Sequence, residues 1–319
     1  MKLKANMYAP ILFGVILLLS GISQTLTELV LKIADHPFLA ATIIQFLVYL
    51  LPLAFYCRMR GLNMVSQIKL RSVPAKKIPF LAIVTTILFT SIVLLRYVGL
   101  FFLNSAFVDT PGALYIPMEG SSTFLVLLCN VILPALFEES IFRGLFLEEY
   151  RSFGPVWAIS ISSLMYAMVH LSWENFVYYL VIGVFLSLIT VISDSIVPAL
   201  VLHVVMNLSY LYVTPSVVEY LRQAGKSPLL PYLLVAFFIL LFVFLFSRLE
   251  NIYQDRVYEE MLQSRKEMLK KEIERSRDQN EEPKDKKDLR WITFKEIFLS
   301  PIFLVTVAVF IMLASGILF

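Results

Sequence analysis

The sequence predicts an all-α fold, a polytopic membrane bundle of about nine transmembrane helices. Of its 319 residues 59% are hydrophobic and 16% are charged, whereas soluble domains have roughly 45–50% and about 25%. Apolar runs of about 20 residues, the length that crosses a bilayer as a helix, recur along the chain. Charged residues collect between these runs and in one late segment.

The apolar runs define nine predicted spans. Prolines stand at or near the starts of several of them, where the missing N–H of proline costs little. The predicted spans are residues 8–33, 38–57, 79–102, 122–147, 155–172, 175–192, 196–213, 229–247 and 298–318.

Spans and charges together divide the chain into five segments. Two groups of transmembrane helices come first, the second of which carries the polar motifs described below, and a charged segment separates the last two helices. The segments are N-terminal helices in 1–120, the motif-bearing core in 121–213, a further helix in 214–247, the charged segment in 248–297 and a last helix in 298–319.

The distribution of Lys and Arg predicts the orientation. They collect before the first span and in the loop between the second and third spans, while residues 103–122 contain none. Positive residues favour the cytoplasmic side of a membrane. We therefore expect a multi-pass membrane protein, in the cell membrane if its source is bacterial, with the N-terminus and residues 248–297 in the cytoplasm.

The charged segment holds about half of all the charged residues of the chain, in equal numbers of each sign. Apolar residues at three- and four-residue steps between Tyr258 and Ile273 predict a helix with a narrow apolar stripe. We interpret it as a solvated linker helix, because the stripe lasts barely two heptads. The alternative is an arm that docks a protein partner at 248–290. The net charge of +3 does not indicate nucleic acid as a partner.

Ionisable residues are rare inside the predicted spans. An isolated charge there costs on the order of 2.5–3.5 kcal/mol or more, so such residues mark functional sites unless they are paired or lie at an interface. Glu28 and Arg96 are interpreted as structural or interfacial. The remaining candidates are Glu138, Glu139, Arg143, His170 and His203.

Helical spacing separates the two adjacent glutamates. Glu139 and Arg143 are i and i+4, so they share a helix face and can pair. Glu138 is turned by about 100° from Glu139 and has Phe142 at i+4. Glu138 is therefore left free to act as a general base.

Two further pairs share this spacing. Tyr166 and His170 are i and i+4 in the fifth predicted span, and His203 and Asn207 are i and i+4 in the seventh. An imidazole beside an amide offers two N–H donors, as an oxyanion hole requires. With Glu138 these residues suggest hydrolysis by activated water. Each of them alone is also explained by a hydrogen bond between helices.

The stretches EESIFR, YAMVH and HVVMN resemble the EExxxR, FxxxH and HxxxN motifs of the CAAX prenyl protease and bacteriocin-processing family (CPBP or ABI) of intramembrane proteases. The resemblance covers roughly residues 120–213. It implies an endopeptidase that acts on a membrane-associated or lipidated peptide or protein, with membrane lipid around it.

The same resemblance implies roles for single residues. Glu138 and His170 would activate water, and His203 with Asn207 would stabilise the oxyanion. Glu139, Arg143 and Tyr166, which stands where the family has Phe, would give structural support. No cofactor is certain, but Glu138, His170 and His203 could bind zinc, since carboxylate and imidazole suit that metal. We favour a metal-free glutamate and histidine site.

Two other functions stay open at this point. A proton-coupled carrier could use the same glutamate and histidines as a relay. A catalytically inactive scaffold would act through the charged segment instead. The predicted spans also place Glu138 and His203 nearer the cytoplasmic side of the membrane and His170 nearer the outer side. For the three to act together, the span at 155–172 must be short, tilted or set deep.

Overall fold

The structure, a computed structural model, describes residues 2–34, 36–68, most of 70–90, 122–213 and 293–317, with scattered positions between 229 and 270. Every regular element in these parts of the chain is helical, which confirms the all-α fold. The predicted spans at 79–102 and 229–247, Arg96 and the charged segment lie wholly or largely outside the described residues.

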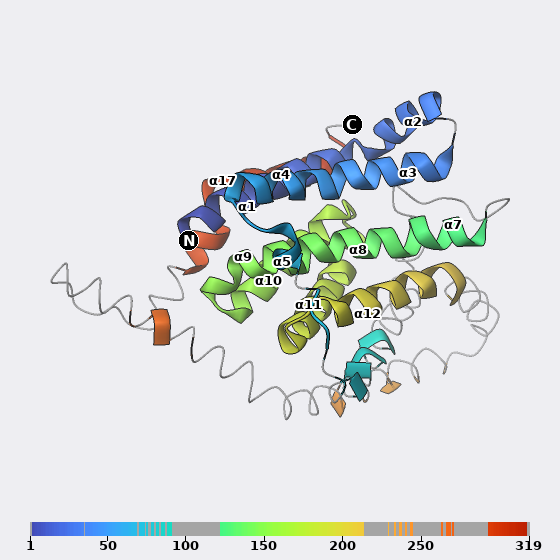
Figure 1. Cartoon of the computed structure of the whole chain (residues 1–319). Helices are drawn as coiled ribbons and strands as arrows, with labels where there is room; N and C mark the ends of the chain where they lie inside the picture. The colour runs from blue at the N-terminus through green and yellow to red at the C-terminus, as the bar shows by residue number, and fades with distance from the viewer. Residues whose placement is uncertain are drawn as a thin grey trace.

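The N-terminal helices and the last helix form one layer (Figure 1). Helix α1 (Lys2–Gly21) is followed by α2 (Ser23–Ala34), and the two are bent by 58°. The C-terminal α17 (Pro301–Ala314) runs along α1, and its Thr306 hydroxyl donates to the carbonyl of Pro10 over 3.2 Å. The first and last parts of the chain therefore pack together.

The next long helix, from Pro37 to Arg60, consists of α3 (Pro37–Gln45), a π-helical turn η1 (Phe46–Leu50) and α4 (Leu51–Arg60). A proline near the start of α4 explains the π turn, because proline has no N–H for the usual hydrogen bond and clashes with the preceding turn. The short α5 (Met64–Ile68) follows a loop.

A helix of 31 residues carries the EESIFR motif through the middle of the molecule (Figure 1). A proline again follows its first π turn, η3, and the second π turn, η4, begins directly after Glu139. Its parts are α7 (Thr123–Leu127), η3 (Leu128–Ile132), α8 (Leu133–Glu139), η4 (Ser140–Phe146), α9 (Leu147–Tyr150) and the 3₁₀ turn η5 (Arg151–Phe153).

Three helices complete the core around this long helix. They are α10 (Pro155–Val169), α11 (Phe176–Ser193) and α12 (Val197–Leu208), the last extended by the π turn η6 (Ser209–Val213). The 15 residues of α10 extend about 22 Å, less than the roughly 30 Å of a hydrocarbon core. The helix that ends next to His170 is thus short, as one site formed by Glu138, His170 and His203 would require.

By length and composition three helices in the described parts can cross a membrane, or four if the bent α1–α2 pair is one span. The count of about nine is therefore not confirmed. Three predicted spans instead correspond to shorter apolar helices, because α10, the helix from Val197 to Tyr212 and α17 each have fewer than 18 residues.

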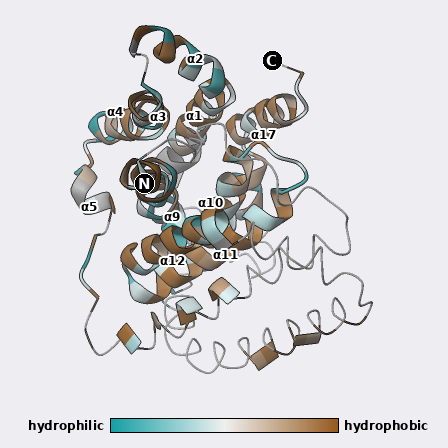
Figure 2. Ribbon diagram, turned by 90° about the vertical axis from the view of Figure 1, so that its right-hand side faces the viewer, coloured by the Kyte–Doolittle hydropathy of each residue, from teal (hydrophilic) through white to brown (hydrophobic). Residues whose placement is uncertain are grey.

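Hydrophobic residues make up much of these helices (Figure 2), and many of them are exposed as well as buried in the core. Along α1 the exposed residues include Ile11, Val15 and Leu18, and along α17 they include Leu304 and Val305. A helix that is apolar all round is either buried or surrounded by lipid. The outward faces therefore indicate a multi-pass membrane protein, while the cytoplasmic position of the N-terminus stays a prediction.

Gly183 sets the spacing between α10 and α11. A Cβ atom there would lie 2.9 Å from the backbone Cα of Ser163, which cannot move aside without shifting the helix. We expect Gly183→Ala to lower the free energy of unfolding by about 1–3 kcal/mol, the usual cost of overpacking.

Gly14→Ala is the matched control for this prediction, since a Cβ there meets only the Thr306 hydroxyl at an ordinary 3.7 Å. Unfolding of both variants in detergent micelles measures the difference. Equal stability of the two variants would show that α10 and α11 can separate freely.

Candidate active site

The predicted pair of Glu139 and Arg143 forms within the long helix. A guanidinium nitrogen of Arg143 lies 3.0 Å from Oε1 of Glu139, and both side chains are fully buried. Each buried charge offsets part of the cost of removing the other from water. The i, i+4 prediction is thus correct in geometry, even though η4 begins between the two residues.

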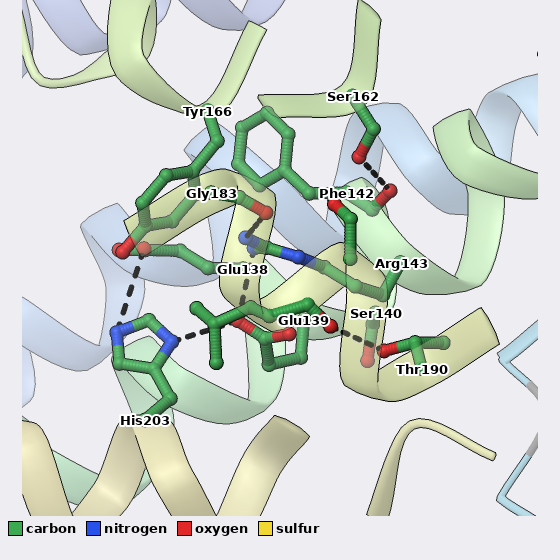
Figure 3. Close-up of polar contacts among 12 residues, drawn as sticks. Glu138, Glu139, Ser140, Phe142, Arg143, Ser162, Tyr166, Gly183, Thr190 and His203 are labelled. Carbon is green, nitrogen blue, oxygen red and sulfur yellow. Dashed lines mark hydrogen bonds and ion pairs between the residues drawn. The ribbon is translucent and has the colours of Figure 1, made fainter. Parts of the chain in front are cut away.

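Arg143 also contacts two neighbouring helices (Figure 3). Its second terminal nitrogen donates to the carbonyl of Gly183 in α11 over 3.3 Å. Its guanidinium lies 4.3 Å from the centre of the Tyr166 ring of α10, within the range of a cation–π contact. Arg143 therefore links its own long helix to α10 and α11.

The π turn that contains Arg143 is held by a contact with α10. The hydroxyl of Ser162 donates to the carbonyl of Phe142 over 2.7 Å (Figure 3). Irregular turns leave backbone carbonyls to be satisfied by side chains, and π turns occur often at functional sites. This contact fixes the backbone one residue before Arg143.

His203 of α12 lies between the two glutamates (Figure 3). Its Nδ1 is 2.8 Å from Oε1 of Glu139, the oxygen that also accepts from Arg143. Its Nε2 is 3.9 Å from Oε2 of Glu138. His203 and Glu138 are 4% and 9% exposed, so the two groups face one another away from bulk water.

The partners of His203 determine which of its nitrogens carries a proton. A carboxylate oxygen in an ion pair is an acceptor, so Nδ1 donates to Glu139. The Nε2 atom is then the one that faces Glu138 and can exchange a proton there. Glu139 thus orients the His203 ring in addition to pairing with Arg143.

His170 lies at the C-terminal end of α10, one turn after Tyr166. Its Nδ1 donates to the carbonyl of Tyr166 over 2.8 Å, because a carbonyl can only accept. Its ring is 4.8 Å from the Tyr166 ring and stacks on Tyr179 at 3.6 Å. The Tyr166 ring in turn lies 6.1 Å from that of His203, so both imidazoles have this tyrosine as a neighbour.

Asn207 follows His203 by one turn but makes its contact with another element. Its side-chain nitrogen donates to the carbonyl of Val131 in η3 over 3.3 Å. One of its two N–H groups is thereby used to hold α12 against the long helix, and an amide nitrogen has a second one to offer.

The structure does not bring the three predicted zinc ligands, Glu138, His170 and His203, together as one group. Among the residues that the structure describes, no three His, Cys, Asp or Glu side chains gather in a way that could hold a metal ion. Glu138 and His203 lie together, and His170 and His203 each lie near the Tyr166 ring. We therefore derive no step through a metal.

The contact between Glu139 and His203 is among the interactions that the sequence did not predict. Spacing within one helix assigned Glu139 to Arg143, and no local pattern connects positions 139 and 203. The signal that could have indicated it is chemical: a buried imidazole needs a partner at Nδ1, and a carboxylate can accept from more than one donor.

Fold and site together define a class of protein: a helical membrane protein with an acid and imidazole cluster buried between its helices. Residues 120–209 match the family model described as type II CAAX prenyl endopeptidase Rce1-like. This match confirms the resemblance that the three motifs gave and covers all of their residues. The family that this model describes is one of endopeptidases, and the match covers less than half of the chain. No curated protein and no solved structure matches the chain.

Proposed function

We propose that the protein is an intramembrane endopeptidase in which Glu138 activates a water molecule for attack on a peptide bond. The observation that carries this proposal is the position of Glu138. It is buried, its Oε2 has no hydrogen-bond partner among the described residues, and the nearby Arg143 is paired with Glu139. A buried carboxylate oxygen that accepts no hydrogen bond costs stability, so its retention is best explained by chemistry.

Glu138 acts as the general base in this proposal. It accepts a proton from water while the hydroxide adds to the peptide carbonyl, and it returns that proton to the leaving amine. His203 supports the step, because its Nε2 faces Glu138 and its Nδ1 is held by Glu139. His170 is held in the same tautomer, because its Nδ1–H donates to a carbonyl. Its Nε2 can therefore accept a hydrogen bond from the water.

The oxyanion of the tetrahedral intermediate needs donors on the other side of the peptide carbonyl. Asn207 keeps one N–H for this role after its contact with Val131, and His203 provides Nε2–H whenever the imidazole is protonated. The family description supports a prenylated CAAX protein or peptide as substrate. The apolar outward faces of the helices fit a substrate that arrives from the lipid.

The first experiment compares the N-termini of membrane proteins and peptides in cells that carry the wild type or Glu138→Gln at equal expression. We expect a set of new N-termini that is present with the wild type and absent with the variant. Glu149→Gln is the matched control, because Glu149 is equally buried in the same long helix but pairs with Arg60 over 3.5 Å, away from Glu138.

The alternatives predict different outcomes of this comparison. A proton-coupled carrier gives identical N-termini in all strains and a pH-dependent flux that Glu138→Gln abolishes. A catalytically inactive scaffold also gives identical N-termini, but its phenotype depends on residues 248–290 instead of Glu138. Identical N-termini, with both variants folded, would therefore overturn the protease proposal.

A further inference from the structure

Tyr166 occupies the centre of the site, where four helical elements meet. It is 2% exposed, and its ring contacts Phe142 at 5.4 Å, His170 at 4.8 Å and His203 at 6.1 Å. The Arg143 guanidinium lies 4.3 Å from the ring centre. A ring surrounded in this way cannot change its tilt without moving these groups, so the direction of its hydroxyl is fixed.

The hydroxyl of Tyr166 points toward the carboxylate of Glu138 (Figure 3). His203 lies beside both groups, since its ring centre is 6.1 Å from that of Tyr166 and its Nε2 is 3.9 Å from Oε2 of Glu138. Glu138 has a buried oxygen, Oε2, that receives no hydrogen bond from the described residues. The Tyr166 ring thus directs its hydroxyl, a hydrogen-bond donor, toward Glu138, the glutamate of the pair that receives no hydrogen bond from the described part of the chain.

A phenylalanine, the residue of the FxxxH pattern, would keep every ring contact but supply no donor. The structure gives no hydrogen bond between the two groups at rest. Hydrogen bonds in catalytic sites are often long in the free enzyme and shorten when the substrate binds. A tyrosine at this position is therefore able to hold the base during the reaction.

We propose that Tyr166 is a positioning residue that donates its hydroxyl to Glu138 and directs the other carboxylate oxygen at the attacking water. This inference rests on the proposed function. The step breaks no bond of Tyr166: the water proton moves to Glu138, and the tyrosine keeps its own proton throughout. The residue acts through Glu138 and does not itself contact the peptide.

The test is Tyr166→Phe in the purified full-length chain. The probes are an internally quenched farnesylated peptide that ends in a CaaX sequence and its non-prenylated counterpart. Whichever probe the wild type cleaves in a Glu138-dependent way is used for kinetics. We expect kcat to fall roughly 10- to 100-fold, the range for losing a hydrogen bond to a charged group, with KM and the melting temperature unchanged.

Tyr150→Phe is the matched control, because the Tyr150 hydroxyl is fully buried and has no hydrogen-bond partner among the described residues. It is expected to retain wild-type kinetics. Wild-type kcat in Tyr166→Phe would overturn the positioning role and leave the proposed function intact. A lower melting temperature with a parallel loss of folded enzyme would make the hydroxyl structural and also overturn it. A wild type that cleaves neither probe would instead contradict the proposed function for prenylated and free CaaX peptides.

Discussion

Purified Glu138→Gln is expected to fold like the wild type and to cleave its substrate about 10²- to 10⁴-fold more slowly. That range is the usual contribution of a positioned general base. Glutamine keeps the volume of the side chain but has no basic oxygen to accept the proton of water. The loss should appear in kcat, because the carboxylate is needed in the transition state and the peptide can still bind.

Two companion variants sharpen this prediction. Glu138→Asp keeps the carboxylate but withdraws it by one methylene, so an intermediate rate is expected. Glu149→Gln alters a carboxylate with a similar burial in the same helix and should leave the rate unchanged. Wild-type turnover in Glu138→Gln, measured with either peptide probe, would remove Glu138 from the mechanism.

Arg143→Met is expected to lower the free energy of unfolding by about 3–5 kcal/mol, the cost of breaking a fully buried ion pair. Methionine retains much of the apolar stem of arginine, so lost packing contributes little. The main cost is Glu139, which remains buried without its cation, and the carbonyl of Gly183 also loses its donor. Unfolding in mixed micelles, followed by circular dichroism, measures the change.

The double variant Glu139→Leu with Arg143→Met separates folding from function. Removing both charges of a buried pair is often neutral for stability, so much of the lost free energy should return. Catalysis should not return, because His203 loses the carboxylate that holds its Nδ1. Recovery of both stability and turnover would show that Glu139 only neutralises Arg143.

Much of the fold was predictable because apolar runs report directly on helices in a membrane. The starts of α3, α11 and α17 lie within three residues of the predicted ones, at 38, 175 and 298. The bend between α1 and α2 and the short α10 were not visible as such, because hydropathy measures composition and not helix direction. The π turn that begins after Glu139 has no adjacent proline from which it could have been predicted.

The site was predictable where its geometry lies within one helix. The pair of Glu139 and Arg143 needed only the helical repeat. Contacts between helices were not predictable from one sequence, since nothing local relates His203 to Glu139 or Asn207 to Val131. The catalytic roles of Glu138, His170, His203 and Asn207 therefore stay proposals that rest on position.

The pairing of Glu139 with Arg143 bears on the order in which the protein is assembled. Both residues belong to the same long helix, so their contact can form as soon as that helix leaves the ribosome and enters the membrane. His203 is synthesised 64 residues after Glu139, and only then can the ring face Glu138. Until α12 arrives, one glutamate is already neutralised and the other is not. We therefore expect the ion pair of Glu139 and Arg143 to form before the cluster around Glu138, which α12 completes.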